Sequence, residues 1–153
     1  MFRLLKAITL GILLILTSNF CNISTTWAAG LGVSDAHLSS CPASPNCVVS
    51  QDADIKHSID PITYHIDRNA ARETLLKVLT VVPRTEVVER TDSYIRAVSK
   101  SRIFGFVDDV EFYFPKHENL IHLRSASRVG DSDLGVNRRR MEQIRLALQD
   151  LKI

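Results

Sequence analysis

One connection concentrates the unusual residues of this chain: Ser127-Arg128-Val129-Gly130-Asp131-Ser132-Asp133-Leu134-Gly135-Val136-Asn137-Arg138-Arg139-Arg140. Before it lies a stretch of alternating apolar and polar residues, which is typical of a strand. After it lies a stretch with apolar residues at helical spacing. The connection therefore joins the last strand of a predicted sheet to a closing helix, and any functional site is expected there.

Three of its arginines stand in an unusual place. If Asn137 is the N-cap, Arg138, Arg139 and Arg140 fill the first turn of the helix, where the dipole is positive. An unanswered cation there costs about 0.3–1 kcal/mol. Either Asp131 and Asp133 pair with these arginines and lock the loop, or the helix start binds an anionic group.

The second alternative defines a candidate binding site, which extends to charged residues on the preceding strands. The candidate ligand- or partner-binding residues are Asp109, Arg124, Arg128, Asp131, Ser132, Asp133, Asn137, Arg138 and Arg139.

The N-terminus has the pattern of an export signal. Arg3 and Lys6 precede an apolar run from Ala7 to Leu16, which is shorter than the roughly 20 residues that span a bilayer. Small residues before position 29 predict cleavage after Ala28, so that residues 1–28 form a signal peptide. We expect export to a periplasm or thylakoid lumen. If the segment stays uncleaved, it would be the protein's only contact with a membrane.

The charge of the exported chain argues against a nucleic-acid partner. Removing residues 1–28 takes away two basic residues and no acid, so 19 basic and 17 acidic residues become 17 of each. A formally neutral domain without an aromatic array has no long-range attraction for nucleic acid. The expected partner is instead an unknown protein or a small anionic ligand.

Two cysteines remain after cleavage, in the stretch Cys41-Pro42-Ala43-Ser44-Pro45-Asn46-Cys47. A close pair in an oxidising compartment predicts a disulfide. A loop this short gains about 2–2.5 kcal/mol from the cross-link on the chain-entropy model. A redox or metal role is the alternative, although the spacing is not Cys-x-x-Cys.

The mature chain predicts one two-layer α+β domain over residues 57–153, after a flexible lead-in and stapled loop over 29–56. Residues 48–56 are expected to form a surface loop, and Pro61 confines residues 57–64 to an edge strand or extended coil. Asp67 caps a helix that runs to about Val82, and Pro83 stops it.

Strand patterns follow that helix and predict a mostly antiparallel sheet of four to five strands with two helices on one face. The strands are expected at 85–90 and 94–99, near 103–106, at 110–114, and at 120–128. Val110, Phe112 and Phe114 should face the core, which leaves this strand half-buried. The closing helix should bury Met141, Ile144, Leu148 and Leu151.

Other polar residues give weaker indications of chemistry. Asp108, Asp109 and Glu111 could suggest a metal or acid–base site, but Asp108 would point to the opposite sheet face, so pairing with arginines is favoured. Ser125 or Ser132 would need His122 as a base to act as a nucleophile. No phosphate-binding loop, dinucleotide fingerprint or nucleophile elbow is present, and we expect neither a metal nor a cofactor.

Three motifs together resemble one known family. They are Cys-Pro-x-Ser-Pro-Asn-Cys at 41–47, Asp-Asp-Val-Glu-Phe at 108–112, and Ser-Arg-Val-Gly-x-Ser-Asp-Leu-Gly-x-Asn-Arg at 127–138. The chain is similar over 41–148 to the bacterial and plastid domain of unknown function numbered 1499. The resemblance implies a small exported or membrane-associated domain with no established biochemical role, and it assigns no catalytic residue.

Two functions remain open. In the first, the protein is a non-catalytic accessory or binding domain that engages an anionic group through the arginine-rich loop and helix start. In the second, it is an enzyme acting on a phosphorylated or carboxylated substrate, with Asp109, Asp131 or Asp133 as the base and the arginines as a clamp.

Overall fold

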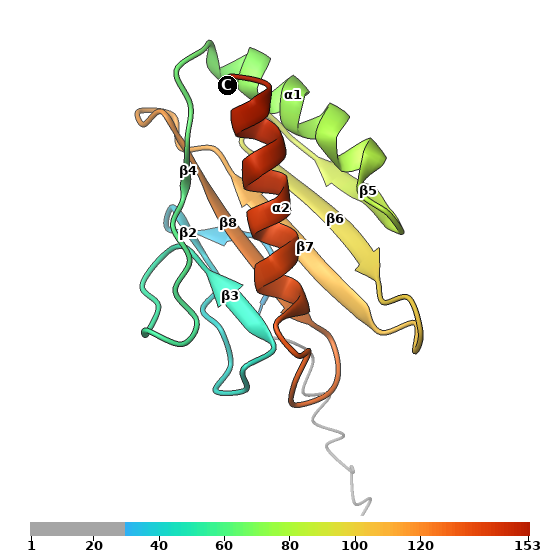
Figure 1. Cartoon of the computed structure of the whole chain (residues 1–153). Helices are drawn as coiled ribbons and strands as arrows, with labels where there is room; N and C mark the ends of the chain where they lie inside the picture. The colour runs from blue at the N-terminus through green and yellow to red at the C-terminus, as the bar shows by residue number, and fades with distance from the viewer. Residues whose placement is uncertain (1–29) are drawn as a thin grey trace, which may run out of the picture.

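The computed structural model describes residues 30–153, so the predicted signal peptide lies outside the described residues. One antiparallel sheet carries two helices on a single face, which confirms the predicted α+β class (Figure 1). The elements are β1 (Val33–Ser34), β2 (His37–Leu38), β3 (Cys47–Val49), β4 (Ile62–Thr63), α1 (Arg68–Val81), β5 (Thr85–Arg90), β6 (Tyr94–Lys100), β7 (Val107–Tyr113), β8 (Leu120–Ser127) and α2 (Val136–Asp150).

The main sheet has the strand order β3-β8-β7-β6-β5, and β4 also pairs with β8. Every pairing between these strands is antiparallel. β3 and β4 are short and lie one after the other along the same strand, since β3 pairs with residues 124–126 and β4 with 120–121. The sheet therefore has six strands. Residues 103–106 form the β6–β7 turn instead of a strand.

The first helix begins where its cap predicts. The Asp67 carboxylate accepts hydrogen bonds from the backbone N–H groups of Asn69 and Ala70, at 2.8 and 3.1 Å. The helix ends at Val81, because the residue before Pro83 is extended. Within residues 30–153, neither helix is long and apolar enough to cross a membrane.

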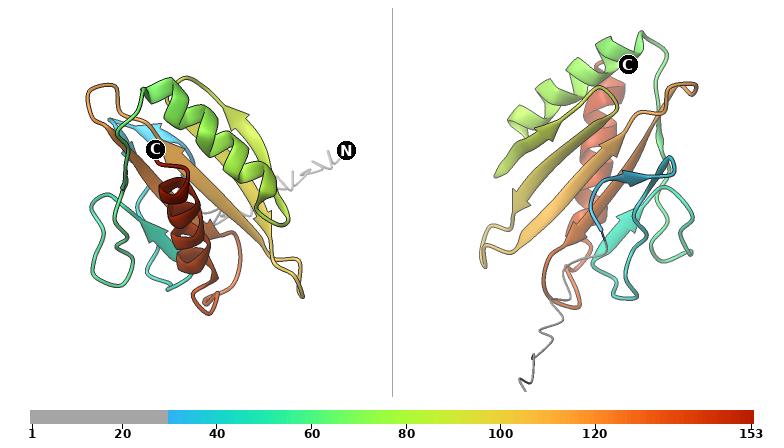
Figure 2. Two further views of the ribbon diagram at one scale, coloured as in Figure 1. Left: turned by 45° about the horizontal axis from the view of Figure 1, so that its top comes forward. Right: turned by 180° about the vertical axis from the view of Figure 1, so that it is seen from behind.

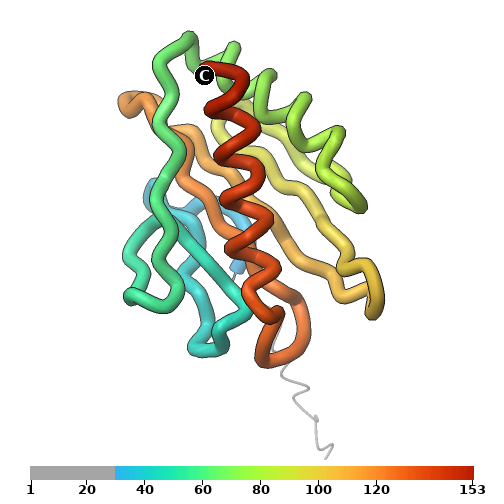
Figure 3. Tube along the Cα trace, viewed as in Figure 1, coloured from blue at the N-terminus to red at the C-terminus, as the bar shows by residue number. Residues whose placement is uncertain are grey.

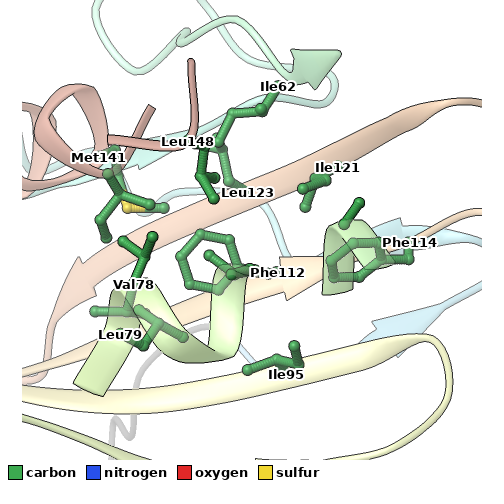
Figure 4. Close-up of a cluster of buried hydrophobic side chains, with 14 of the residues drawn as sticks. Ile62, Val78, Leu79, Ile95, Phe112, Phe114, Ile121, Leu123, Met141 and Leu148 are labelled. Carbon is green, nitrogen blue, oxygen red and sulfur yellow. The ribbon is translucent and has the colours of Figure 1, made fainter. Parts of the chain in front are cut away.

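The main core lies between the sheet and the two helices, as Figure 4 shows. The predicted inward residues Val110, Phe112 and Phe114 are fully buried, and Met141 of α2 belongs to the same core cluster. Leu151 was expected on the buried face of α2 but is 57% exposed. It is the C-cap, where the chain leaves the helix.

The second face of the sheet is also covered, which the sequence did not predict. The segment expected to be a flexible lead-in contains the β1–β2 hairpin, which lies across this face (Figure 2). Leu38 packs there with Val49 and Tyr94 in a smaller apolar cluster. As a result Glu111 is fully buried, so β7 is not the half-buried strand that its alternation suggested.

A further segment runs along the sheet edge beside α2, as the chain trace in Figure 3 shows for residues 50–66. It is tied to α2 by Arg145, whose guanidinium donates hydrogen bonds to the carbonyls of Asp60 and Pro61. The surface loop expected at 48–56 begins instead inside β3. Val48 and Val49 are buried because they lie beside β8.

Candidate functional site

The connection from β8 to α2 begins the helix differently from the prediction. Gly135 is the N-cap, with φ +74°, and Asn137 lies inside the first turn. The capping carboxylate belongs to Asp133, which accepts hydrogen bonds from the backbone N–H of Gly135 at 2.9 Å and of Asn137 at 2.6 Å. The left-handed glycine turns the chain so that a side chain two residues earlier reaches the exposed helix amides. Asn137 as N-cap was therefore wrong.

Asn137 instead joins this connection to the disulfide loop. Its side-chain N–H donates to the carbonyl of Asn46 at 2.9 Å and to Ser127 Oγ at 3.1 Å. The side chain of Asn46 in turn donates to the carbonyl of Gly130. The predicted disulfide between Cys41 and Cys47 is confirmed, and it closes the loop that presents Asn46. Two sequence motifs thus form one buried polar network.

Arg140 completes this network with a charge pair. Its guanidinium lies 2.6 Å from the carboxylate of Asp108 and donates to Asn137 Oδ1 at 2.7 Å. Both charged side chains are buried. Pairing of the arginines with Asp131 and Asp133 was one of the two alternatives, but within residues 30–153 neither acid forms an ion pair. The acid that pairs with an arginine of the helix start is instead Asp108 of β7.

On the other sheet face, Asp109 and Glu111 each pair with arginines, and Asp109 has a second, longer contact to Arg96 at 3.4 Å. Arg128 donates two hydrogen bonds to Asp109, at 2.8 and 2.9 Å, and these bonds raise the pKa of Arg128. Arg124 lies 2.7 Å from Glu111, and both are buried. The expectation that Asp109 and Glu111 share one face, with arginine partners, is confirmed.

The predicted binding residues do not gather into one site. Asp109, Arg124 and Arg128 lie on the face opposite the helices. Arg138 turns toward the edge segment and donates to the carbonyls of Ser58 and Lys56. Two more of them, Asp131 and Ser132, are exposed on the loop. Asp133 and Asn137 serve the helix start and the buried network. Of the predicted binding residues, Arg139 lines a hollow in the surface.

That hollow is here named the basic cleft. It is lined by residues of the α1–β5 connection, of the end of β6 and the β6–β7 turn, and of the first turns of α2. It encloses about 290 Å³. No acidic side chain lines it. The lining residues are Val82, Pro83, Arg84, Ser99, Lys100, Ser101, Arg102, Val136, Arg139, Arg140 and Gln143.

Four cationic side chains of the basic cleft have no acidic partner within residues 30–153. Arg84, Lys100, Arg102 and Arg139 form no ion pair with an acid of residues 30–153. Backbone carbonyls hold two of them: Arg84 donates to Lys100 O at 3.1 Å, and Arg139 to Leu134 O at 2.7 Å. A hollow lined by one sign of charge concentrates counter-ions.

A comparison with protein families gives one match. The model described as "Protein of unknown function (DUF1499)" matches residues 37–148. The chain belongs to the DUF1499 family. The DUF1499 region contains the disulfide loop, the buried polar network and every residue that lines the basic cleft. A comparison with curated proteins gives no match.

Sequence reasoning missed three cleft residues of the DUF1499 region, namely Arg84, Lys100 and Arg102. They do not resemble a motif, and none lies in the Ser127–Arg140 connection. A signal for two of them was present: the predicted hairpin over 85–99 brings Arg84 and Lys100 to the same end of its two strands. The observed pairing of Thr85 with Ser99 places them there, after a β-bulge between Val87 and Glu89.

The remaining candidate for catalysis in the DUF1499 region is a serine–histidine pair. Ser50 Oγ lies 3.2 Å from His122 Nδ1, and burial lowers the pKa of this histidine. Ser50 Oγ also accepts a hydrogen bond from the backbone N–H of Leu123, at 2.9 Å, which joins the edge segment to β8. Ser125, considered as a nucleophile, is buried against Asn137. Within residues 30–153, no cluster of His, Cys, Asp and Glu has a metal-binding arrangement.

Proposed function

We propose that the mature chain is an exported, non-catalytic accessory domain that binds an anionic group of a partner protein or small ligand in the basic cleft. One observation carries the proposal: four cationic side chains without an ion pair in the described part of the chain, residues 30–153, line a single hollow, and no acid of these residues lines it. The basic cleft shares Arg139 with the anion-binding site that the sequence predicted at the start of α2. Arg84, Lys100 and Arg102 are added to it.

The size and construction of the basic cleft suit a small group such as a phosphate or a carboxylate. Its volume is at the low end of small-molecule sites. Its cations come from three separate segments, so they can approach an anion from several directions. Arginine also donates paired hydrogen bonds that match the oxygens of both groups. Arg140 adds no net charge, because Asp108 neutralises it.

The enzyme alternative has less support from the carboxylates that it requires. Arg128 already holds Asp109, on the sheet face opposite the helices. Asp133 caps α2. Asp131 is exposed on the loop and does not line the basic cleft. A cation cluster without a neighbouring base favours binding over acid–base catalysis.

The proposed location follows from the predicted signal peptide, with a periplasm or a thylakoid lumen as the compartment. The disulfide between Cys41 and Cys47 is compatible with such an oxidising space. Fractionation of the native cell, with detection of the chain and of the length of its N-terminus, tests this part. Recovery of a reduced chain from the cytosol would contradict it.

Titration calorimetry of the exported protein with pyrophosphate tests the binding proposal. We expect the double variant Lys100→Ala/Arg102→Ala to bind pyrophosphate at least tenfold more weakly, because two of four unpaired cations are removed. The matched control is Lys116→Ala/Lys152→Ala, which removes the same charge from exposed lysines that do not line the cleft. Equal affinity of both double variants would contradict a site in the basic cleft.

A further inference from the structure

The turn between β6 and β7 exposes an apolar surface beside the basic cleft. The exposed fractions are 81% for Ile103, 75% for Phe104 and 48% for Phe106. The rings of Phe104 and Phe106 stack, with centroids 5.5 Å apart. Three large apolar side chains at one turn, none of them in either core cluster, indicate a contact surface.

The backbone holds this turn in a fixed shape. Ser101 closes it twice: its N–H donates to Phe106 O at 2.8 Å, and its Oγ accepts from the N–H of Phe106 at 2.9 Å. Gly105 has φ +66°, a conformation that other residues rarely adopt. The side chains of Phe104 and Phe106 are thereby brought onto each other. We name residues 102–106 the apolar turn.

The apolar turn and the basic cleft form one continuous surface. Arg102 belongs to both, and Lys100 lies at the end of β6, directly before Ser101. The turn projects beyond the sheet at one corner of the molecule, as Figures 1 and 2 show. Apolar side chains at a projecting tip are thus flanked by cations that have no acidic partner within residues 30–153.

We infer that this surface docks on a lipid bilayer that carries anionic headgroups. Ile103 and Phe104 enter the boundary between headgroups and acyl chains, and Phe106 follows at the rim. Lys100, Arg102 and Arg139 contact the phosphates. The inference rests on the proposed function and specifies its ligand: the anionic group is the phosphate of a membrane lipid.

A bilayer fits this surface better than a folded protein partner does. A projecting apolar tip needs a deformable apolar medium or a partner with a matching hollow, and a bilayer supplies that medium everywhere. Phenylalanine is one of the residues with which interfacial protein segments enter the boundary between headgroups and acyl chains. The absence of acid in the cleft also matches a surface that is uniformly negative over a wide area.

Vesicle sedimentation of the exported protein tests the inference, with phosphatidylcholine vesicles and with vesicles that also contain phosphatidylglycerol. We expect binding only when phosphatidylglycerol is present. The variant Ile103→Ser/Phe104→Ser should bind at least tenfold more weakly, since two exposed apolar side chains no longer insert. Lys100→Ala/Arg102→Ala should lose about fivefold for each cation.

Two controls separate the apolar turn from general surface effects. Val81→Ser/Leu146→Ser removes two exposed apolar residues of the helices and should leave vesicle binding unchanged. Lys116→Ala/Lys152→Ala should weaken it far less than the cleft variant. Binding by Ile103→Ser/Phe104→Ser that equals the wild type, or equal binding to both kinds of vesicle, would overturn the inference.

A fluorescent reporter gives a second measurement. The only tryptophan is Trp27, so cleavage after Ala28 would leave the exported chain without one. Phe104→Trp then reports on the apolar turn, and its emission should shift to shorter wavelength with phosphatidylglycerol vesicles. An unshifted emission, or photocrosslinking from position 104 to a protein instead of lipid, counts against a bilayer.

Pyrophosphate binding distinguishes the inference from the function on which it rests. Ile103→Ser/Phe104→Ser should keep wild-type affinity for pyrophosphate while it loses vesicles. A wild-type protein that binds pyrophosphate but no vesicle overturns the lipid inference and leaves the cleft as a site for a soluble anion. A protein that binds neither contradicts both.

Discussion

The side-chain N–H of Asn137 donates a hydrogen bond of 2.9 Å to the main-chain carbonyl of Asn46, 91 residues earlier in the chain. This contact joins the first turn of α2 to the disulfide loop. Asn137 also accepts from Arg140, whose charge is paired with Asp108 on β7. The polar residues between Ser127 and Arg140 therefore mainly attach α2 to the edge of the sheet through hydrogen bonds and an ion pair. The basic cleft lies beside this network.

Replacing Asn137 should destabilise the protein. In Asn137→Ala, the carbonyl of Asn46 and the guanidinium of Arg140 each lose one hydrogen bond but keep another, to the N–H of Ser127 and to Ser125 Oγ. Each lost hydrogen bond therefore costs about 0.5–1.5 kcal/mol. We expect urea denaturation to show a loss of unfolding free energy in this range or above it. Asn69→Ala is the control, since Asn69 lies in the first turn of α1, outside this network. A loss no larger than that of the control would show that the network contributes little.

Removing the disulfide should also lower stability. The bond joins residues six apart, and the chain-entropy model gives about 2 kcal/mol for a loop of this size. Cys41→Ser/Cys47→Ser should therefore unfold at lower urea concentration than the wild type. A reductant should shift the wild type toward the variant and leave the variant itself unchanged. A reductant effect on the variant would mean that some other process lowers stability.

Acid should destabilise the fold through His122. Burial lowers the pKa of this histidine below its usual 6.5. Above that pH both states hold a neutral ring, so the histidine makes no contribution to the pH dependence of stability. Below it, the unfolded state binds the proton more readily, and the free energy of unfolding falls.

The measurement compares unfolding free energies near about pH 7.5 and about pH 5, on either side of the usual histidine pKa. His122→Gln should lose less stability between them than the wild type, while His117→Gln, at an exposed turn residue, should behave as the wild type does. If His122→Gln retains the full pH dependence, the titrating group is another residue.

Local patterns predicted the parts of the fold that depend on neighbouring residues. The capping carboxylate of Asp67, the stop at Pro83 and the alternation through Val110 and Phe112 are properties of short windows, and the structure has the elements that they indicate. β3 was not predicted, because three residues are too few to show the alternation of a strand. It exists because β8 offers it an edge.

The covered second face and the basic cleft depend on contacts between distant segments. The N–H of Gly32 donates to the carboxylate of Glu111 at 2.8 Å, and nothing local marks this pairing. The arginines from 138 to 140 were expected to act together at the helix start, but they point in three directions, because successive helix residues are about 100° apart. Of the three, only Arg139 therefore brings an unpaired charge to the basic cleft.

The buried pair of Arg124 and Glu111 should show strong energetic coupling. Glu111 accepts from Arg124 at 2.7 Å, from the hydroxyl of Tyr94 at 2.7 Å and from the N–H of Gly32 at 2.8 Å. The Nε and Nη2 atoms of Arg124 are buried and have no hydrogen-bond partner within residues 30–153. The carboxylate is thus well satisfied, while the guanidinium depends on it for its single bond.

Removing either charge alone leaves the other uncompensated, at a cost of about 3–5 kcal/mol. Glu111→Gln leaves the guanidinium of Arg124 without a counter-charge, and Arg124→Met leaves the carboxylate of Glu111 without one. The double variant leaves no uncompensated charge at these two positions, and the amide oxygen of the introduced glutamine can still accept from Tyr94 and Gly32. We expect it to be more stable than either single variant. A double-mutant cycle in urea measures this coupling; if the two losses simply add, the charges act independently.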